Sequence, residues 1–215
     1  QLKTLAEPQP SWCKLIQICS YLRIPKHVQG LVELVILLIA AGDGFSGWAS
    51  LNDTVMGGRS SGACSVGNDG LLMQAEVVAE GGGFVSCRSP RWNPPLDLSA
   101  AGAIELVLQG DGRRYKFAVA SSDLAGKLAD LVPGGLRWVR DFDTQPTGTT
   151  TVRIPFADLL PTLRANPVSI PLRFDPSRVV QMQILHSRFA EDGSENIGFR
   201  PGPLRLLVQK LEAVP

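Results

Sequence analysis

The sequence has few of the residues that carry out most acid–base and metal chemistry. It contains two histidines in 215 residues, and His186 has no Cys, His or Glu neighbour at metal-ligand spacing. No CxxC pair occurs among the four cysteines, which excludes the usual zinc signatures. GxSxG, HExxH and a GxGxxG after a strand are also absent. We therefore expect no cofactor, no bound metal and no catalytic residues, and a structural or surface role for His186.

The chain also lacks an excess of charge and a long apolar run. Its 21 Lys and Arg balance 20 Asp and Glu, which argues against a nucleic-acid-binding protein. The longest apolar run, residues 31–41, contains Glu33 and is too short for a membrane-spanning helix, which needs about 20 residues. No secretory signal pattern is apparent. The run predicts a buried helix or strand, or peripheral contact with a membrane.

The cysteines are too sparse to form a disulfide scaffold in a chain of this length. They are Cys13, Cys19, Cys64 and Cys87. We interpret them as mostly buried thiols in a reducing compartment. A disulfide between Cys64 and Cys87, on neighbouring predicted strands, is compatible with the pattern but not required by it.

The composition changes near Gly42–Gly44. Before this point the sequence is apolar and interrupted by prolines, and after it glycines recur at turn spacing. We therefore predict an appendage over residues 1–44 and a main domain over residues 45–215. Helical spacing within residues 12–22 and the apolar residues of 27–41 predict two helices, although β-branched residues leave a strand open for the second segment.

Short apolar runs bounded by glycine and proline predict strands from Phe45 onward. They cover residues 71–78, 83–87, 103–108, 115–119, 136–142, 149–154, 179–185 and 204–211. Gly110–Gly112 predicts a hairpin turn between two of them, and Ala157–Arg164 predicts a short helix. Many short strands at regular spacing favour an all-β antiparallel sandwich or barrel.

The segment Trp48–Gly62 resembles the start of the complex I intermediate-associated protein family. In that family a tryptophan precedes Asn-Asp-x-Val-Met-Gly-Gly-x-Ser, which matches Asn52–Ser60 here. Further family-like segments follow in the family's order: Gly81–Phe84, Leu96–Ser99, Gly110–Tyr115 and Val152–Phe156. The resemblance extends over nearly all of Phe45–Leu211.

This resemblance implies a jelly-roll β-sandwich of the galactose-binding type and a role in assembling or stabilising membrane complexes. Respiratory complex I is the family's namesake, and photosynthetic relatives are tied to photosystem biogenesis. We therefore expect a non-catalytic assembly factor or accessory subunit whose partners are protein subunits of such a complex. The expected location is intracellular, peripheral to a thylakoid, cytoplasmic or mitochondrial-matrix membrane face, and not secreted. Residues 1–44 have no counterpart in the family pattern.

The expected partner- or ligand-binding residues come from the family-like segments and a nearby loop. They are Asn52, Asp53, Met56, Gly57, Gly58, Trp92, Arg113 and Arg114. Each has a structural alternative: Asn, Asp and paired glycines are typical of turns, and the two arginines suit a solvated strand edge. The rival interpretation of the arginines is a docking patch that also includes Arg88, Arg91, Arg137 and Arg140. The sparse Asp and Asn residues disfavour a calcium site.

Two other classes of function remain open. A carbohydrate-binding module would need an exposed aromatic platform; Trp92 lies in a proline-rich loop, whereas Trp48 and Trp138 suit the core. An enzyme with a groove carboxylate would need paired carboxylates, and Glu76 and Glu105 lie in predicted strands. A permanent subunit of a large complex is a further alternative to a transient factor.

Overall fold

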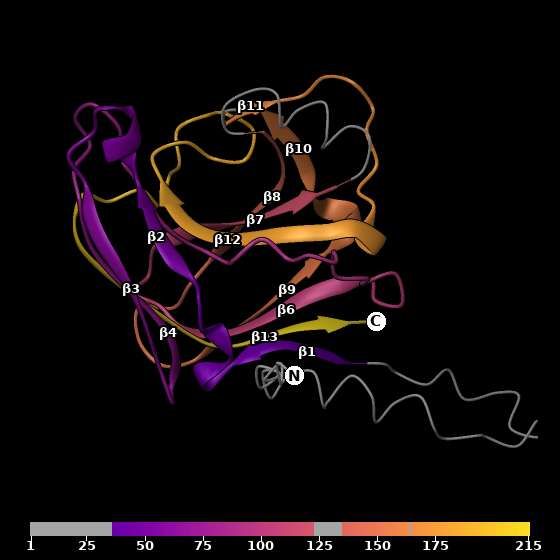
Figure 1. Cartoon of the computed structure of the whole chain (residues 1–215). Coiled ribbons are helices and arrows are strands. Elements are labelled where there is room, and N and C mark those ends of the chain that lie inside the picture. The colour runs from indigo at the N-terminus through magenta and orange to yellow at the C-terminus, as the bar shows by residue number, and fades with distance from the viewer. Residues whose placement is uncertain (1–35, 123–134, 164) are drawn as a thin grey trace, which may run out of the picture. The chain divides into compact units, whose positions relative to one another are not determined.

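Two antiparallel sheets contain most of the residues that the structure describes (Figure 1). The structure is a computed structural model, and it describes residues 36–122, 135–163 and 165–215. These residues belong to a unit that spans Leu34–Pro215. The helical elements described are short 3-10 helices: η1 Gly42–Phe45, η2 Asp53–Met56, η3 Phe156–Asp158 and η4 Pro176–Arg178. The predicted all-β antiparallel jelly-roll sandwich is confirmed.

The first sheet is organised around its longest strand, β13. Its six strands are β1 Leu37–Ala41, β3 Ser61–Gly67, β4 Gly70–Val77, β6 Ala103–Gln109, β9 Thr150–Pro155 and β13 Gly202–Val214. The order is β3-β4-β13-β6-β9, and β1 also pairs with β13. Strand β3 therefore lies at an edge of this sheet, with β4 as its strand neighbour.

The second sheet runs from β11 at one edge to β2 at the other. Its seven strands are β2 Ala49–Asn52, β5 Phe84–Arg88, β7 Arg114–Ser121, β8 Leu136–Asp143, β10 Leu160–Leu163, β11 Asn166–Pro167 and β12 Val179–Ser187. The order is β11-β10-β8-β7-β12-β5-β2. Figure 1 shows β7, β8 and β12 in one layer and β6, β9 and β13 in the other.

The core lies between the two sheets and is built by the alternation of side chains along each strand. In β6, Ile104, Leu106 and Leu108 are fully buried, and the residues between them are half-buried. Each such side chain contributes about 1.5–3 kcal/mol on burial. Trp48 and Trp138 are buried among them, which confirms their predicted place in the core.

The predicted hairpin around Gly110–Gly112 is wrong. Strand β6 pairs with β9 and β13, whereas β7 pairs with β8 and β12 in the other sheet. The turn therefore carries the chain from one sheet to the other. Turn residues and the alternation of apolar and polar residues predict that the chain reverses between two strands. They do not predict that these two strands pair with each other.

The first sheet begins earlier than the predicted domain start at Phe45. Strand β1 pairs with β13 from Leu37↔Ala213 to Ala41↔Lys210, and Ala40 is buried in the core. This part of the apolar run is thus a strand, as its β-branched residues allow. The predicted helix over residues 12–22 and residues 27–35 of the second prediction lie outside the described residues.

The short helix predicted over Ala157–Arg164 is also wrong. The 3-10 helix η3 ends at Asp158, and Leu160–Leu163 form β10, which pairs with β8 and β11. The edge of β8 supplies backbone hydrogen-bond partners that the isolated segment cannot foresee. Arg164 lies outside the described residues.

Cys64 and Cys87 form a disulfide, which corrects the prediction of free thiols for this pair. Cys64 is in β3 of the first sheet and Cys87 is in β5 of the second. The bond therefore links the two layers of the sandwich covalently. Cys13 and Cys19 lie outside the described residues.

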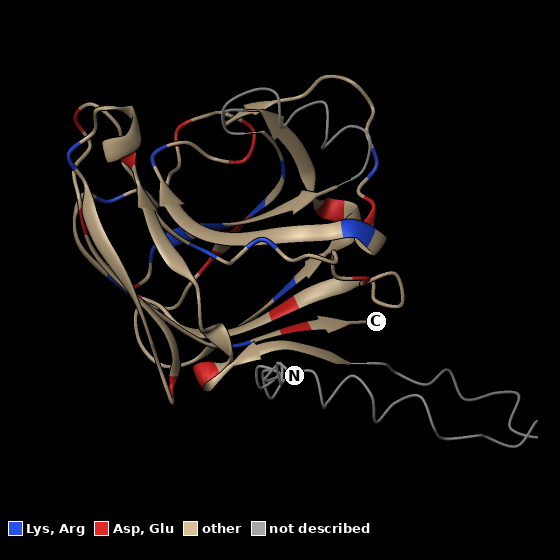
Figure 2. Cartoon of the chain, viewed as in Figure 1, with Lys and Arg blue, Asp and Glu red and all other residues tan. Residues whose placement is uncertain are grey.

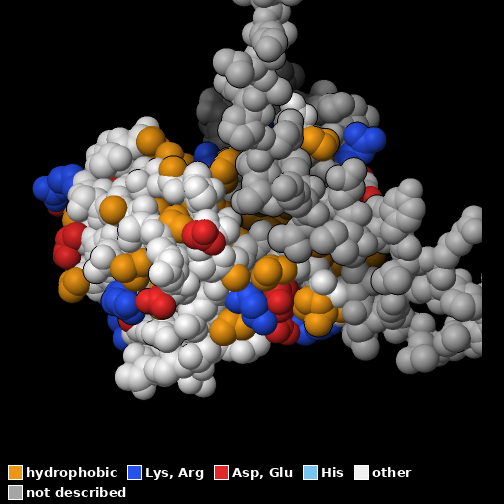
Figure 3. All heavy atoms as spheres, turned by 60° about the horizontal axis from the view of Figure 1, so that its bottom comes forward, with side chains coloured by type: hydrophobic (Ala, Val, Ile, Leu, Met, Phe, Trp, Pro, Cys, Tyr) orange, Lys and Arg blue, Asp and Glu red, His pale blue; other side chains and the backbone are white. Residues whose placement is uncertain are grey.

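The surface formed by the described residues is mixed in character. Acidic and basic residues are interspersed along strands and loops (Figure 2). On the part of the face in Figure 3 that described residues form, hydrophobic side chains occur in small groups among polar and charged ones. In the described part of the chain, no helix has the length and apolar character needed to cross a membrane.

Candidate interaction site

The family-like segment Asn52–Ser60 forms a tight loop between β2 and β3. Asn52 ends β2, and the next four residues form η2. Gly57 ends this helix at φ 87°, a left-handed conformation that favours glycine, and its N–H donates to the carbonyls of Asp53 and Thr54. The predicted use of a glycine to supply positive φ is thus found at Gly57.

Asp53 lies at the centre of this loop with an exposed fraction of 0%. Its carboxylate accepts hydrogen bonds from the backbone N–H of Ser60 at 2.9 Å, Gly83 at 2.6 Å and Phe84 at 3.3 Å. It also accepts from the Ser60 hydroxyl at 2.7 Å. Burial by itself raises the pKa of Asp53, but these hydrogen bonds outweigh it and lower the pKa below its usual value. Asp53 therefore stays ionised and braces the loop rather than facing a groove.

Two glycines make room for the Asp53 carboxylate. A Cβ atom at Gly58 would lie 2.3 Å from Asp53 Cγ, and one at Gly82 would lie 2.5 Å from Asp53 Oδ2. Gly58 is thus required by close approach rather than by positive φ. The segments Asn52–Ser60 and Gly81–Phe84 are far apart in the sequence, and Asp53 brings them together.

Asn52 supports the same loop from the end of β2. Its side-chain amide donates to the Gly62 carbonyl at 3.0 Å, and its Oδ1 is buried without a hydrogen-bond partner. The side chain is half-buried and directed toward β3. Asn52 is therefore part of the brace and not of an exposed surface.

The tip of the loop carries two exposed apolar side chains. Val55 is 64% exposed and Met56 is 70% exposed. An exposed ion pair between Arg59 and Glu80 lies near the base of the loop. Of the predicted site residues in this segment, Met56 is the one whose side chain reaches solvent. Val55 was not predicted, although it belongs to the same Asn52–Ser60 segment.

Arg113 is buried, which contradicts its predicted place on a solvated edge. Its guanidinium pairs with Asp111 and donates to the carbonyls of Arg200 at 3.3 Å and Pro203 at 3.0 Å. Because these partners come from the loop before β13 and its start, Arg113 fastens the crossing between the sheets. The predicted docking role would require an exposed guanidinium.

Asp111 is the acceptor around which this crossing is built. It accepts from the Tyr115 hydroxyl at 2.9 Å and from the Arg205 N–H at 3.3 Å. Burial, with the Asp111 charge beside it, raises the pKa of Tyr115 well above its usual value. A Cβ at Gly110 would lie 2.3 Å from Thr144 Cβ, so glycine is required there. The Gly110–Tyr115 segment is thus structural.

Arg114 and Trp92 are not free surface groups. Arg114 makes a bidentate ion pair with Asp143, with both distances 2.8 Å. Trp92 is half-buried and packs against the core, and its backbone N–H donates to the Val180 carbonyl at 2.8 Å. The prediction that Trp92 is an exposed aromatic is wrong. Its loop lies along β12, which the proline-rich sequence did not reveal.

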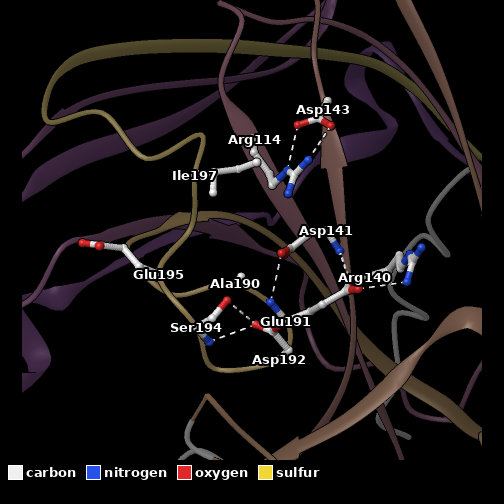
Figure 4. A pocket seen from close by; sticks show the side chains of 10 residues that line it. All are labelled: Arg114, Arg140, Asp141, Asp143, Ala190, Glu191, Asp192, Ser194, Glu195 and Ile197. Carbon is white, nitrogen blue, oxygen red and sulfur yellow. Dashed lines mark hydrogen bonds and ion pairs between the residues drawn. The ribbon is translucent and has the colours of Figure 1, made fainter.

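A polar pocket of about 320 Å³ lies beside β7 and β8, under the loop that follows β12 (Figure 4). Its lining residues are Arg114, Arg140, Asp141, Asp143, Ala190, Glu191, Asp192, Ser194, Glu195 and Ile197. Arg114 pairs with Asp143, and Arg140 pairs with Glu191 at 2.9 Å. The Arg140–Glu191 pair therefore holds the loop to the sheet, whereas the Arg114–Asp143 pair lies within the sheet between β7 and β8.

The floor of this pocket contains a buried cross-strand pair. Lys116 and Asp141 face each other at 4.0 Å, and burial lowers the pKa of Lys116 and raises that of Asp141. Lys116 also donates to the Phe189 carbonyl, and Asp141 accepts from the Glu191 N–H, both at 2.9 Å. These bonds fasten the loop over the pair. Sequence analysis missed this site because its residues come from distant segments.

Glu76 and Glu105 do not form a carboxylate pair for glycoside hydrolysis, and no metal site emerges from the described residues. They include no group of three or more His, Cys, Asp or Glu placed to hold a metal ion. Glu76 and Glu105 lie opposite Pro203 and Glu212 of β13, nine residues apart. That is about 30 Å along the strand, whereas glycosidases hold their carboxylates about 5–10 Å apart.

His186 is fully buried, as the predicted structural role requires. It lies between Tyr115 and Phe199, and its Nδ1 is 2.9 Å from the Arg114 carbonyl. Burial lowers the pKa of His186, so the imidazole is neutral at pH 7. It therefore acts as a core residue.

Solved structures with the same fold include carbohydrate-binding modules. The family 11 module of the cellulosomal cellulase Lic26A-Cel5E of Clostridium thermocellum matches with a TM-score of 0.55 at 14% identity, covering 85% of this chain and 96% of that one. The family 11 module from Clostridium thermocellum in complex with a β-1,3-1,4-mixed-linked tetrasaccharide matches with a TM-score of 0.52 at 15% identity, covering 83% and 95%. At this identity the likeness concerns the fold alone. The comparison with curated proteins gives no significant match.

The sequence itself matches a protein family over most of its length. The matching family model is that of complex I intermediate-associated protein 30 (CIA30), over residues 38–208. The match begins within β1 and ends within β13, so it covers both sheets of the sandwich. The chain therefore belongs to the CIA30 family.

Proposed function

We propose that this chain is a non-catalytic assembly factor or accessory subunit that binds protein subunits of a membrane-associated respiratory or photosynthetic complex. Its family gives it a complex I assembly-related character. The contact surface in this proposal is the tip of the Asn52–Ser60 loop, with Met56 and Val55 as the contacting side chains. The location is peripheral to the membrane that holds the complex.

The observation that carries this proposal is an apolar tip on a rigid support. Val55 and Met56 are each more than 60% exposed, while Asp53, two residues before Val55, is fully buried. A rigid loop loses little conformational entropy when it binds, so more of the contact energy is kept. Each apolar side chain, when buried by a partner, contributes about 1.5–3 kcal/mol. The fitting partner is a protein surface with an apolar recess.

Sugar binding and catalysis have weaker support from the described residues. Among these, Phe189 is the one exposed aromatic ring, whereas sugar platforms usually stack on exposed aromatics. The separation of Glu76 and Glu105 argues against a hydrolase that uses these two carboxylates as its pair. Protein binding is therefore the preferred function.

Affinity purification from gently solubilised membranes, followed by mass spectrometry, tests the proposal. Three tagged forms are compared: the unchanged chain, Met56→Glu, and Ile170→Glu as the matched control. Ile170 is 66% exposed, close to Met56 at 70%, and lies in a different loop. We expect subunits of one complex to co-purify with the unchanged chain and with Ile170→Glu, and to be lost with Met56→Glu.

Two outcomes would contradict the proposal. Recovery of the unchanged chain alone and monodisperse would remove the assembly role and favour a glycan or another small ligand. Equal recovery of the complex with Met56→Glu and with Ile170→Glu would remove the Asn52–Ser60 loop as its contact site.

A further inference from the structure

Two cross-links of different chemistry join β3 to β5. The first is the Asp53 carboxylate, which holds Ser60, directly before β3, and the N–H groups of Gly83 and Phe84 at the start of β5. The second is the disulfide between Cys64 and Cys87. The two links lie about four residues apart on these strands, which is about 13 Å.

These links matter because β3 is held on one side only. It is an edge strand of the first sheet, paired with β4, while β5 lies inside the second sheet between β12 and β2. No backbone ladder joins β3 to β5, since they belong to different sheets. The position of β3 relative to β5 therefore depends on side-chain packing, the hydrogen bonds of Asp53, the Asn52–Gly62 hydrogen bond from the neighbouring strand β2, and the disulfide.

The two cysteines of the disulfide differ in exposure. Cys87 is 1% exposed, whereas Cys64 is half-buried on the edge strand. A thiolate from an external dithiol can therefore reach Cys64 Sγ before it reaches Cys87. This asymmetry gives reduction a defined order.

Thiol–disulfide exchange with a dithiol opens the cross-link in two balanced steps. The first dithiol sulfur attacks Cys64 Sγ and forms a mixed disulfide, while the Cys64–Cys87 bond breaks and Cys87 leaves as a thiolate that takes up a proton. The second dithiol sulfur then attacks the first, and Cys64 leaves as a thiolate that is also protonated. Two electrons pass to the protein, and the dithiol becomes a disulfide. A disulfide donor reverses both steps.

We infer that the Cys64–Cys87 disulfide is a redox-controlled lock on the Asn52–Ser60 loop. In the oxidised protein β3 is held to β5 at both links, and the Asp53 carboxylate stays buried among its donors. In the reduced protein the edge strand separates more easily from β5, water reaches Asp53, and the loop loosens. The consequence for partner binding rests on the proposed function, whereas the change in the loop does not.

Hydrogen exchange read by mass spectrometry measures the loop directly. The experiment uses the full chain with Cys13→Ser and Cys19→Ser, so that Cys64 and Cys87 are the remaining cysteines. After reduction with dithiothreitol, we expect amides of residues 53–60 and 83–84 to exchange at least about tenfold faster. The melting temperature should fall by roughly 6–12 °C.

A double variant and a matched control separate the lock from general destabilisation. Cys64→Ala with Cys87→Ala should give the fast exchange without reductant and should not respond to it. Ile154→Ala removes a buried side chain of β9, away from β3 and β5. It should lower the melting temperature while the exchange of residues 53–60 stays slow and still responds to dithiothreitol.

The inference would be overturned if the amides of residues 53–60 exchanged at the same rate after confirmed reduction. It would also be overturned if Ile154→Ala accelerated their exchange as much as reduction does. If the double variant does not fold, reduction of the folded parent decides the question. Capture of the complex by oxidised and reduced protein is a separate readout. A loop that loosens on reduction while neither form captures a complex would uphold the lock and contradict the proposed function.

Discussion

Two loops of this protein are both held together by hydrogen bonds to an aspartate, but they differ in which side chains they expose to solvent. In both, a buried or half-buried aspartate gathers hydrogen-bond donors from distant parts of the chain, and a glycine beside it permits close approach. Asp53 organises the loop between β2 and β3, and Asp111 organises the crossing between β6 and β7. The first loop exposes Val55 and Met56, whereas the second turns Arg113 inward.

Under the proposed function, this difference separates a purely structural segment from one whose side chains are available for binding. Both segments carry the family-like pattern, so the pattern alone does not separate them. In the Asp111 crossing the polar side chains bond to one another, because Arg113 and Tyr115 both donate hydrogen bonds to Asp111. The Asp53 loop instead exposes the side chains of Val55 and Met56, which are the contacting groups of the proposed function.

The largest expected effect is that of Asp53→Ala. It leaves the N–H groups of Ser60, Gly83 and Phe84 without their acceptor, and each buried unpaired donor costs about 1–3 kcal/mol. We expect the free energy of unfolding to fall by roughly 3–5 kcal/mol in a urea titration. Glu76→Gln, on an exposed position of β4, is the control and should change it by less than about 0.5 kcal/mol.

Asp111→Ala should have a smaller effect. It removes the acceptor of Tyr115 and the partner of Arg113, but Arg113 keeps two carbonyl acceptors. The expected loss is about 2–3 kcal/mol in the same titration. If it matched or exceeded the loss for Asp53→Ala, the Asp53 loop would not be the more tightly braced of the two.

The free energy of unfolding should fall moderately as the pH is lowered. The group responsible is His186, which lies next to the Asp111 crossing. Its pKa is lower in the folded protein than in the unfolded chain, so the unfolded chain binds the proton first as pH falls. The stability that His186 contributes is full above its ordinary value of about 6.5 and declines below it, by at most about 1.4 kcal/mol per pH unit. Urea titrations at pH 7.5 and 5.5 measure this decline.

His186→Phe serves as the matched variant for that titration. The phenyl ring can occupy the same place between Tyr115 and Phe199 but does not titrate. The stability difference between the unchanged chain and the variant should therefore shrink as the pH falls. A difference that is constant with pH would show that His186 does not titrate in this window.

The smallest expected effect on stability is that of Met56→Glu. Because Met56 is exposed, the free energy of unfolding should change by less than about 0.5 kcal/mol. The same substitution should abolish capture of the complex, whereas Asp53→Asn should weaken capture only through the loop. A large loss of stability in Met56→Glu would instead make its side chain part of the brace.

The sequence predicted eight of the strands but missed β2, β3, β10 and β11, and it did not predict how the strands pair. Alternation placed strands close to β4, β8, β12 and β13, because period-two burial is a local property. Strands β6 and β7 belong to different sheets, and Leu160–Leu163 form a strand that pairs with β8. Both outcomes depended on which strand edges were available for pairing. Such pairing energies come from residues far away in the chain.

By itself the sequence determined an all-β sandwich, most of its turn positions and the segment that carries the proposed contact. The reason is that glycine, proline and apolar periodicity act over a few residues. The tertiary structure decided which groups of those segments are exposed, because burial depends on the strand or loop packed against them. It turned Asp53 and Arg113 inward, left Met56 outside, and brought Cys64 to Cys87 across the two sheets.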